Sequence, residues 1–127
     1  MRSEGRSVGR SHHRLLAWQR GIALVKIVYE HTASFPSHEA FGLTSQMRRS
    51  AVSVPANLAE GAARNSTREF SRFLGIARGS LSELETYVVI ARELGYLKGA
   101  EILDEKIDEV FRLLGGLINA QARKGRA

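Results

Sequence analysis

Apolar residues recur at steps of three and four positions over four stretches of the chain, the spacing that places side chains on one face of an α-helix. The first stretch begins at Leu15 and should end before Pro36, because a residue preceding proline is pushed out of the helical region. The fourth stretch follows Gly99. The stripes expected to face a core are Leu15, Trp18, Ile22, Val25 and Tyr29; Leu43, Met47, Ala51, Val54, Leu58 and Ala62; Phe70, Phe73, Ala77, Leu81, Leu84, Val88 and Ala91; and Leu103, Ile107, Val110, Leu114 and Leu117.

Pro55 lies inside the second stretch. Proline lacks an amide hydrogen and collides with the preceding helical turn, so a continuous helix must kink there. The apolar register is unbroken across the proline, which favours a kinked helix over the alternative, a break at Val54. The start of this helix, near Ser37 or Thr44, is left open by the sequence.

The third helix carries a signal at each end. Ser66-Thr67-Arg68-Glu69 has the spacing of a capping box, in which Ser66 accepts from the Glu69 amide and Glu69 reaches back to the cap. Gly95 suits the left-handed conformation that ends many helices.

Four amphipathic helices with short connections bury their apolar faces most simply as an antiparallel, up-down four-helix bundle, so we expect an all-α fold. A length of 127 residues allows one such domain. We expect a basic, flexible N-terminal arm over 1–14, the bundle over 15–122 and a basic C-terminal tail over 123–127. Apolar residues outside the stripes, such as Val52, Val89 and Ile90, exceed what one bundle covers and predict self-association.

The net charge of +6 is unevenly distributed. Residues 1–14 hold four arginines and one glutamate, and the chain end adds three basic residues, whereas the body between them is neutral. Within that body, 48–78 carries six arginines and two glutamates, while 83–109 carries eight acidic and three basic residues. The fold is therefore expected to be electrically polarised.

Several classes of function lack the residues they need. The chain has no cysteine, which excludes disulfides and thiolate sites and fits a reducing cytoplasm. His12 and His13 lack a third ligand nearby, and no Glu-x-x-His pair of a di-iron bundle occurs, so no metal is expected. Neither a nucleophile motif, a phosphate loop nor a dinucleotide fingerprint is found, which predicts no enzyme, cofactor or small-molecule substrate. Without a long apolar run or a secretory signal, no membrane association is expected.

Basic residues are the strongest candidates for function. Arginine presents a planar fork of donors that matches phosphate, and the terminal basic residues lack local acids. The alternative is that the arginines pair with acids of the same or a neighbouring subunit, as in a head-to-tail interface that closes into a ring. The candidate nucleic-acid-binding residues are Arg14, Arg48, Arg49, Arg64, Arg68, Arg72, Arg123, Lys124 and Arg126.

A second group of polar residues stands among small ones, which let two helices approach closely. Asn57 and Glu60 are expected to bond across to Ser80 or to backbone freed by Pro55, because a buried polar group without a partner costs about 1 to 3 kcal/mol. Asn57, Glu60, Ser80 and Glu83 are therefore interpreted as a structural polar cluster rather than a catalytic one.

The chain resembles the bacterial four-helix-bundle proteins encoded in 23S rRNA intervening sequences, a family similar to the accessory variability protein of diversity-generating retroelements. The resemblance spans about 15–116 and is carried by Trp18-Gln19, Phe35-Pro36, the stretches 41–49, 53–61 and 77–86, Phe73-Leu74 and Leu94-Gly95-Tyr96. It implies a four-helix protomer and a ring-like homopentamer. For the retroelement relatives it also implies a basic surface that binds nucleic acid and a reverse transcriptase.

The basic positions that match the family are Arg48, Arg49, Arg64 and Arg72, whereas the neutral body departs from the strongly basic retroelement relatives. Two hypotheses follow. The first is an oligomeric, sequence-tolerant RNA- or DNA-binding protein. The second is a ring-forming scaffold or protein-interaction module of the reverse-transcriptase accessory type, whose charge pairs are used between subunits.

Overall fold

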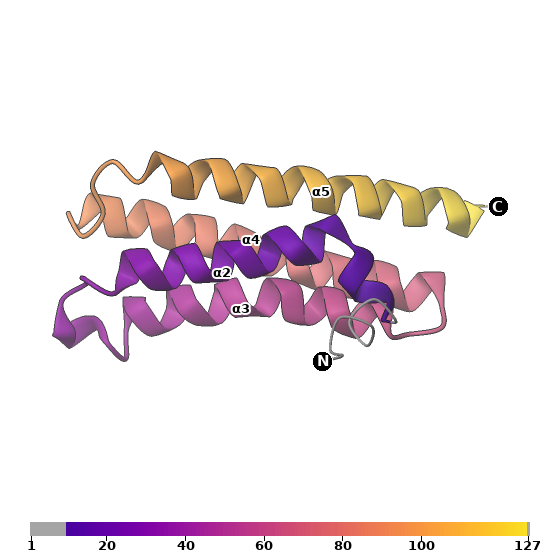
Figure 1. Ribbon diagram of the computed structural model, residues 1–127, viewed down its shortest axis with the longest axis horizontal. Helices are drawn as coiled ribbons and strands as arrows, with labels where there is room; N and C mark the ends of the chain where they lie inside the picture. Colours follow the sequence, from indigo (N-terminus) through magenta and orange to yellow (C-terminus); the bar gives the residue numbers. More distant parts are fainter. Residues whose placement is uncertain (1–9, 127) are drawn as a thin grey trace, which may run out of the picture.

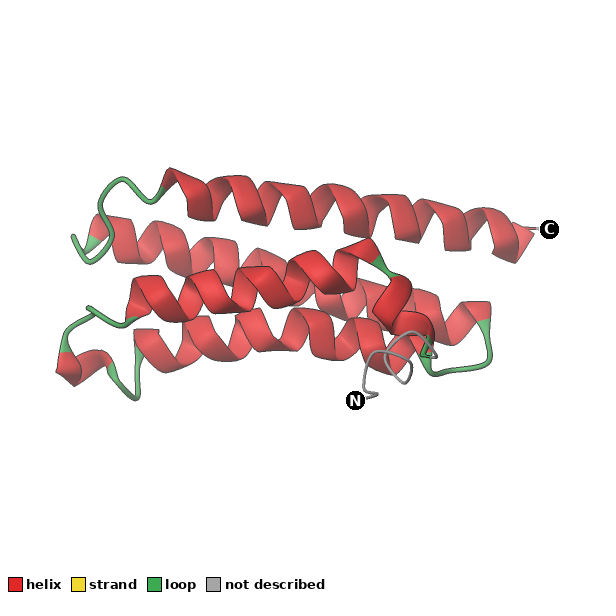
Figure 2. Cartoon of the chain, in the orientation of Figure 1, coloured by secondary structure: helices red, strands yellow, loops and turns green. Residues whose placement is uncertain are grey.

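The computed structural model describes residues 10–126, and this part of the chain is helical without strands. Four long helices, α2 (Leu16–Thr32), α3 (Leu43–Ala62), α4 (Thr67–Glu93) and α5 (Glu101–Arg126), lie lengthwise against one another (Figure 1). Short 3-10 helices, η1 (Ser11–Arg14) and η2 (Ser37–Glu39), precede α2 and α3. The α2–α3 and α4–α5 connections lie at one end of the bundle and the α3–α4 connection at the other (Figure 2). The predicted all-α four-helix bundle is confirmed.

The core lies between the four helices and is built mainly from aliphatic side chains. α3, α4 and α5 bury the stripes predicted for them, apart from Leu43, Ala62, Phe70 and Leu117, which are half-buried at the ends. The large side chains that are fully enclosed are Leu24, Val28, Met47, Val54, Leu58, Leu74, Leu81, Leu84, Val88, Leu103, Ile107 and Leu114.

The stripe predicted for the first helix is wrong at Ile22 and Tyr29, whereas Trp18 and Val25 pack partly buried against the core. Ile22 and Tyr29 are 47% and 43% exposed, and the residues of α2 that face the core are Ala17, Gly21, Leu24, Val28 and Thr32. The physical reason is that Gly21 faces α3: a Cβ added there would be in ordinary van der Waals contact with Cβ of Pro55, at 3.5 Å. Ala17 and Gly21 are thus two of the five buried residues, whereas the stripe predicted for this helix contained only large apolar residues.

α3 runs without interruption from Leu43 to Ala62, so the alternative break at Val54 is wrong. Pro55 is buried inside the helix, and the kink expected at this position stays a prediction. The helix begins at Leu43, whose amide donates to Oε1 of Glu39 at 3.0 Å. Glu39 in the preceding turn therefore supplies an acceptor for the first turn of α3, where helical partners are lacking.

Both ends of α4 follow the sequence signals. Ser66 Oγ accepts from the Glu69 amide at 2.9 Å, as expected of the capping box. At the other end Gly95 has a φ of +79°, and the amides of Gly95 and Tyr96 donate to the carbonyls of Arg92 and Ala91 at 3.0 and 2.9 Å. This pair of bonds is a Schellman motif, which satisfies carbonyls that the helix end leaves open.

The basic segments at the chain ends are more structured than expected within the described residues. Ser11–Arg14 form the 3-10 helix η1, and the rings of His12 and His13 each lie 5.1 Å from the Trp18 ring between centroids. α5 continues through Arg126, so the last basic residues lie on helical turns rather than in a separate tail. The remainder of the expected N-terminal arm, residues 1–9, lies outside the described residues. None of the described helices is long and apolar enough to span a membrane.

Candidate nucleic-acid interface

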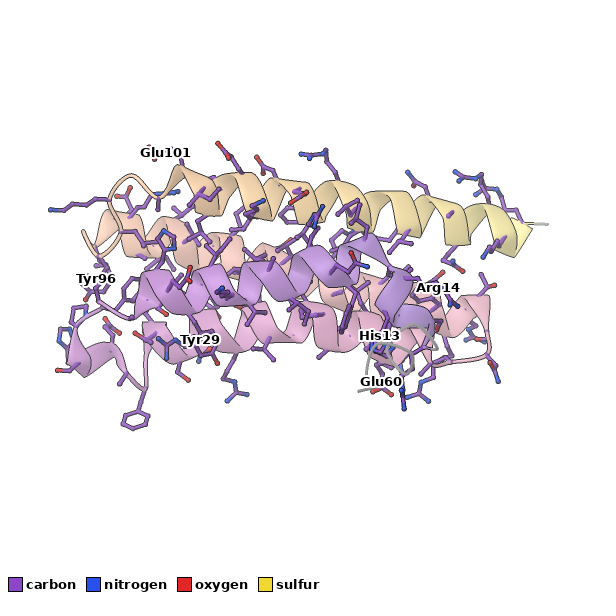
Figure 3. The ribbon with its side chains drawn as sticks, in the orientation of Figure 1. His13, Arg14, Tyr29, Glu60, Tyr96 and Glu101 are labelled. Atoms are coloured by element: carbon purple, nitrogen blue, oxygen red, sulfur yellow. The ribbon has the colours of Figure 1, made fainter. Side chains whose placement is uncertain are left out.

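The fold gathers most of the predicted basic residues at the end of the bundle where α3 passes into α4. Arg64 lies in this connection, and Arg68 and Arg72 follow on the first turns of α4. Ser11 Oγ donates to the Ala62 carbonyl at 3.4 Å, which holds η1 at the same end. Figure 3 shows Arg14 and His13 towards this end, with Glu60 at a similar position along the bundle. We call this surface the basic end: Arg14, Arg64, Arg68, Arg72, Arg123, Lys124 and Arg126.

Two arginines of the basic end pair with carboxylates of the same protomer. Arg64 lies 2.6 Å from Glu60, and Arg72 lies 3.4 Å from Glu69, in both cases close in sequence. Their guanidinium carbons also lie 5.2 and 4.5 Å from the centroid of the Phe73 ring. All four charged side chains are well exposed, and ion pairs of this kind are weak because water screens them. The alternative of internal charge pairing therefore applies in part to this surface.

The α3–α4 connection, the start of α4 and the last turns of α5 line a shallow, open hollow of about 340 Å³ at the basic end. Arg64 and Lys124 both line it, although they are far apart in the sequence. The other lining residues are Asn65, Ser66, Thr67, Phe70 and Gln121. The sequence showed the two basic groups separately, and only the packing of α5 beside the α3–α4 connection brings them together.

Arg48 and Arg49 lie away from the basic end, in a groove of about 550 Å³ between α2 and the first half of α3. Arg48 Nε donates to Thr32 Oγ1 at 2.9 Å and Nη2 donates to the Tyr29 carbonyl at 3.4 Å. Its guanidinium carbon lies 4.4 Å from the centroid of the Tyr29 ring. These contacts fix the direction of the guanidinium through neutral oxygens and an aromatic face. They leave its positive charge uncompensated by the groups that hold it.

Two exposed aromatic residues also line this groove, and sequence reasoning missed both as functional candidates. Phe41 is 98% exposed in the turn before α3. Tyr29 was placed on the buried stripe of the first helix, but it lies on the surface beside α3 (Figure 3). One signal was present: Phe41 stands next to Gly42 at a helix start, outside every apolar stripe.

The expected polar cluster is divided by the structure. Asn57 Nδ2 donates to the carbonyl and hydroxyl of Ser53 at 2.8 and 2.9 Å, and Ser53 Oγ bonds to Ser80 Oγ at 2.7 Å. This chain of bonds links α3 to α4 at the buried Ser80. Ser53 was not among the candidates, although it lies one helical turn before Asn57. Glu60 faces the surface with Arg64, and Glu83 lines a separate hollow with Arg49.

The acidic part of the chain lies at the opposite end of α5. Arg92 donates two hydrogen bonds to Asp104, at 2.9 and 2.7 Å, and thereby joins the end of α4 to the start of α5. Farther along, Arg20 pairs with Glu109 at 3.2 Å. α5 itself has acidic residues in its first turn and basic residues in its last. This order suits the helix dipole and polarises the protomer from end to end.

His12 precedes Arg14 in the 3-10 helix η1. Partial burial, followed by the positive charges of His13 and Arg10, lowers the pKa of His12. Within residues 10–126, no group of three or more His, Asp or Glu side chains is placed to hold a metal ion.

The fold and these surfaces define a small helical-bundle protein with exposed arginines and open surface grooves. The sequence matches the family model described as 23S rRNA-intervening sequence protein over residues 13–116, and the chain belongs to this family. It is not a known family of enzymes. A comparison with curated proteins found no match.

Proposed function

We propose that the chain is a non-enzymatic, oligomeric four-helix-bundle protein of the cytoplasm that binds RNA or DNA through its exposed arginines. The observation that carries this proposal is the position of Arg48. It is held by the Thr32 hydroxyl and the Tyr29 ring rather than by an acid, beside the exposed ring of Phe41.

This arrangement has the two components that single-stranded nucleic acid requires. A guanidinium oriented by its own hydrogen bonds has further N–H groups to offer a phosphate, and it loses little freedom on binding. An exposed aromatic ring offers a face on which an unpaired base can stack, at about 1 to 3 kcal/mol per base. Thr44 and Ser45 also line the groove of Arg48 and Phe41, and hydroxyl side chains can hydrogen-bond to the sugar and to base edges.

Salt titration of the full chain tests this proposal. A labelled single-stranded RNA should bind at low salt, and its affinity should fall by about tenfold or more as salt rises from about 50 to about 200 mM, because phosphate contacts release counterions. Absence of binding at low salt, or binding indifferent to salt, would contradict phosphate contact.

A matched pair of variants locates the site. Arg48→Gln should weaken RNA binding by about tenfold, whereas Arg78→Gln, at an exposed position of α4, removes the same charge and should weaken it far less. Phe41→Ala should weaken binding of single-stranded RNA more than that of duplex RNA, because only unpaired bases stack. Equal effects of Arg48→Gln and Arg78→Gln would mean that RNA binds through the overall positive charge and not at the groove of Arg48.

We also propose that the protomers assemble, and the family resemblance suggests a ring of five. Two features support assembly: the apolar side chains left on the surface, among them Ile22, Val89 and Ile102, and the end-to-end polarity, which suits head-to-tail contacts. Light scattering should give a multiple of the 14.0 kDa protomer. A lone protomer at working concentration would contradict assembly.

The second candidate function is a ring-forming scaffold or protein-interaction module, such as a partner of a reverse transcriptase, without physiological nucleic-acid binding. The pairing of Arg64 with Glu60 and of Arg72 with Glu69 favours it, because these charges are already engaged. Assembly that persists while RNA binding is absent at low salt would select this function over the first.

A further inference from the structure

We propose that the hollow at the start of α4 is a binding site for one phosphoryl group. It lies between the α3–α4 connection and the last turns of α5, about 340 Å³ in volume, and polar or basic side chains make up most of its lining. It is separate from the groove of Arg48 and Phe41. The inference rests on the proposed function only where the phosphate belongs to a nucleic acid.

The first group of donors is the backbone at the N-terminus of α4. The amides of Thr67 and Arg68 have no helical acceptor, because a helix leaves its first N–H groups open. Ser66 accepts from the Glu69 amide through its side chain and from the Phe70 amide through its carbonyl. The two amides ahead of Glu69 thus remain available, at the positive end of a helix of 27 residues.

Gln121 provides a second and independent observation. It reaches into the hollow from α5 and only 6% of it is exposed, yet its amide has no hydrogen-bond partner among residues 10–126. Glu109 Oε1 is the one buried side-chain polar atom of the described residues that lacks a hydrogen-bond partner, so the Gln121 amide stays reachable from the hollow. A phosphate oxygen in the hollow would accept from the Gln121 NH2 group.

The charges around the hollow favour an anion. Arg64 and Lys124 line it, and Arg68 stands next to Thr67 at the helix start. Two carboxylates at this end are each paired with a cation, Glu60 with Arg64 and Glu69 with Arg72. Lys124 lines the hollow from α5, and lysine commonly binds phosphate as a point charge.

Titration of the 15N-labelled full chain with inorganic phosphate tests the inference directly. The amide signals of Thr67 and Arg68 and the side-chain NH2 signal of Gln121 should shift together and saturate. Chloride at the same ionic strength should leave them in place. Failure of these three signals to move under phosphate would overturn the inference.

Gln121→Met separates a ligand-binding role from a structural one. Methionine has a similar length and no amide, so it should keep the packing of this side chain and leave the stability close to that of the wild type. Phosphate affinity should fall by about tenfold. A loss of stability with unchanged phosphate affinity would show that Gln121 is structural and would overturn its role. Lys124→Gln should also weaken binding, whereas Lys98→Gln, in the turn between α4 and α5, should not.

Oligonucleotides of one sequence, with and without a 5′-phosphate, identify the source of the phosphoryl group. If the phosphorylated strand binds more tightly, and Gln121→Met loses this difference, the ligand of this site is the terminal phosphate of a nucleic acid. Equal binding of both strands alongside saturable inorganic phosphate would assign the site to a free anion. RNA binding could depend on salt and on Arg48 while phosphate moves none of the three signals. That result would overturn this inference and leave the proposed function standing.

Discussion

The hydroxyl of Tyr96 donates a hydrogen bond of 3.0 Å to Oε2 of Glu39. The other oxygen of the same carboxylate accepts from the amide of Leu43 at 3.0 Å. One side chain therefore joins the turn before α3, the first turn of α3 and the turn after α4. The bond from the Leu43 amide, followed by that from Tyr96, lowers the pKa of Glu39, and the same carboxylate raises the pKa of Tyr96.

This pair should make stability depend on pH in two opposite directions. Because folding lowers the pKa of Glu39, its contribution to the free energy of unfolding is complete above the pKa of the unfolded state. This contribution is lost as the pH falls through the pKa of the folded state. Because folding raises the pKa of Tyr96, its contribution to the free energy of unfolding is present below the pKa of the unfolded state. This contribution is lost as the pH rises through the pKa of the folded state. Denaturant midpoints should therefore fall less steeply in acid for Glu39→Gln, and less steeply in alkali for Tyr96→Phe. Glu85→Gln, an exposed position on α4, serves as control and should keep both slopes.

Gly61 marks a close approach of α3 to α4. A Cβ at this position would lie 2.7 Å from Cβ of Phe73 and 3.0 Å from Cδ1 of Phe70. Gly61→Ala should therefore destabilise the fold by about 1 to 3 kcal/mol, the usual cost of overpacking. Gly79→Ala on α4 meets open space and should instead stabilise by about 0.5 to 1 kcal/mol. Chemical denaturation measures both, and a neutral Gly61→Ala would contradict the close approach.

The Ser53–Ser80 hydrogen bond should contribute measurably to the packing of α3 against α4. Ser80→Ala should cost about 0.5 to 1.5 kcal/mol, because it removes a buried bond of 2.7 Å. In a double-mutant cycle with Ser53→Ala, the two costs should be strongly non-additive. Simple additivity would mean that the two hydroxyls do not stabilise each other. Thr86→Ala, whose hydroxyl bonds within α4 at an exposed position, is the control.

The orientation of α2 can be tested by two truncations two residues apart. Leu24 is fully buried and Ile22 is 47% exposed. Leu24→Ala should cost about 2 to 5 kcal/mol, whereas Ile22→Ala should change the stability of the protomer by less than about 0.5 kcal/mol. Ile22→Ala should still weaken self-association if this face is covered by a second copy. Comparable losses of stability in both variants would restore the stripe first expected from the sequence.

Local signals were sufficient wherever a structure depends on near neighbours. The capping bond from Glu69 to Ser66 and the left-handed Gly95 follow from backbone chemistry within a few residues. The buried stripes of α3, α4 and α5 follow from large apolar residues at helical spacing. The buried stripe of the first helix could not be predicted in this way, because Gly21 faces Pro55 in the core and a glycine gives no apolar signal.

The sequence by itself determined that this chain forms four amphipathic helices, where most of them begin and end, and that its charges are unevenly placed. Only the tertiary structure decided that Lys124 and Arg64 line one hollow, that Gln121 lines it with them, and that the guanidinium of Arg48 lies over the ring of Tyr29 in the groove that the exposed Phe41 also lines. The physical reason is that helix formation depends on contacts three and four residues apart. The surfaces depend instead on how whole helices pack, and contacts at small residues such as Gly21 and Gly61 set that packing.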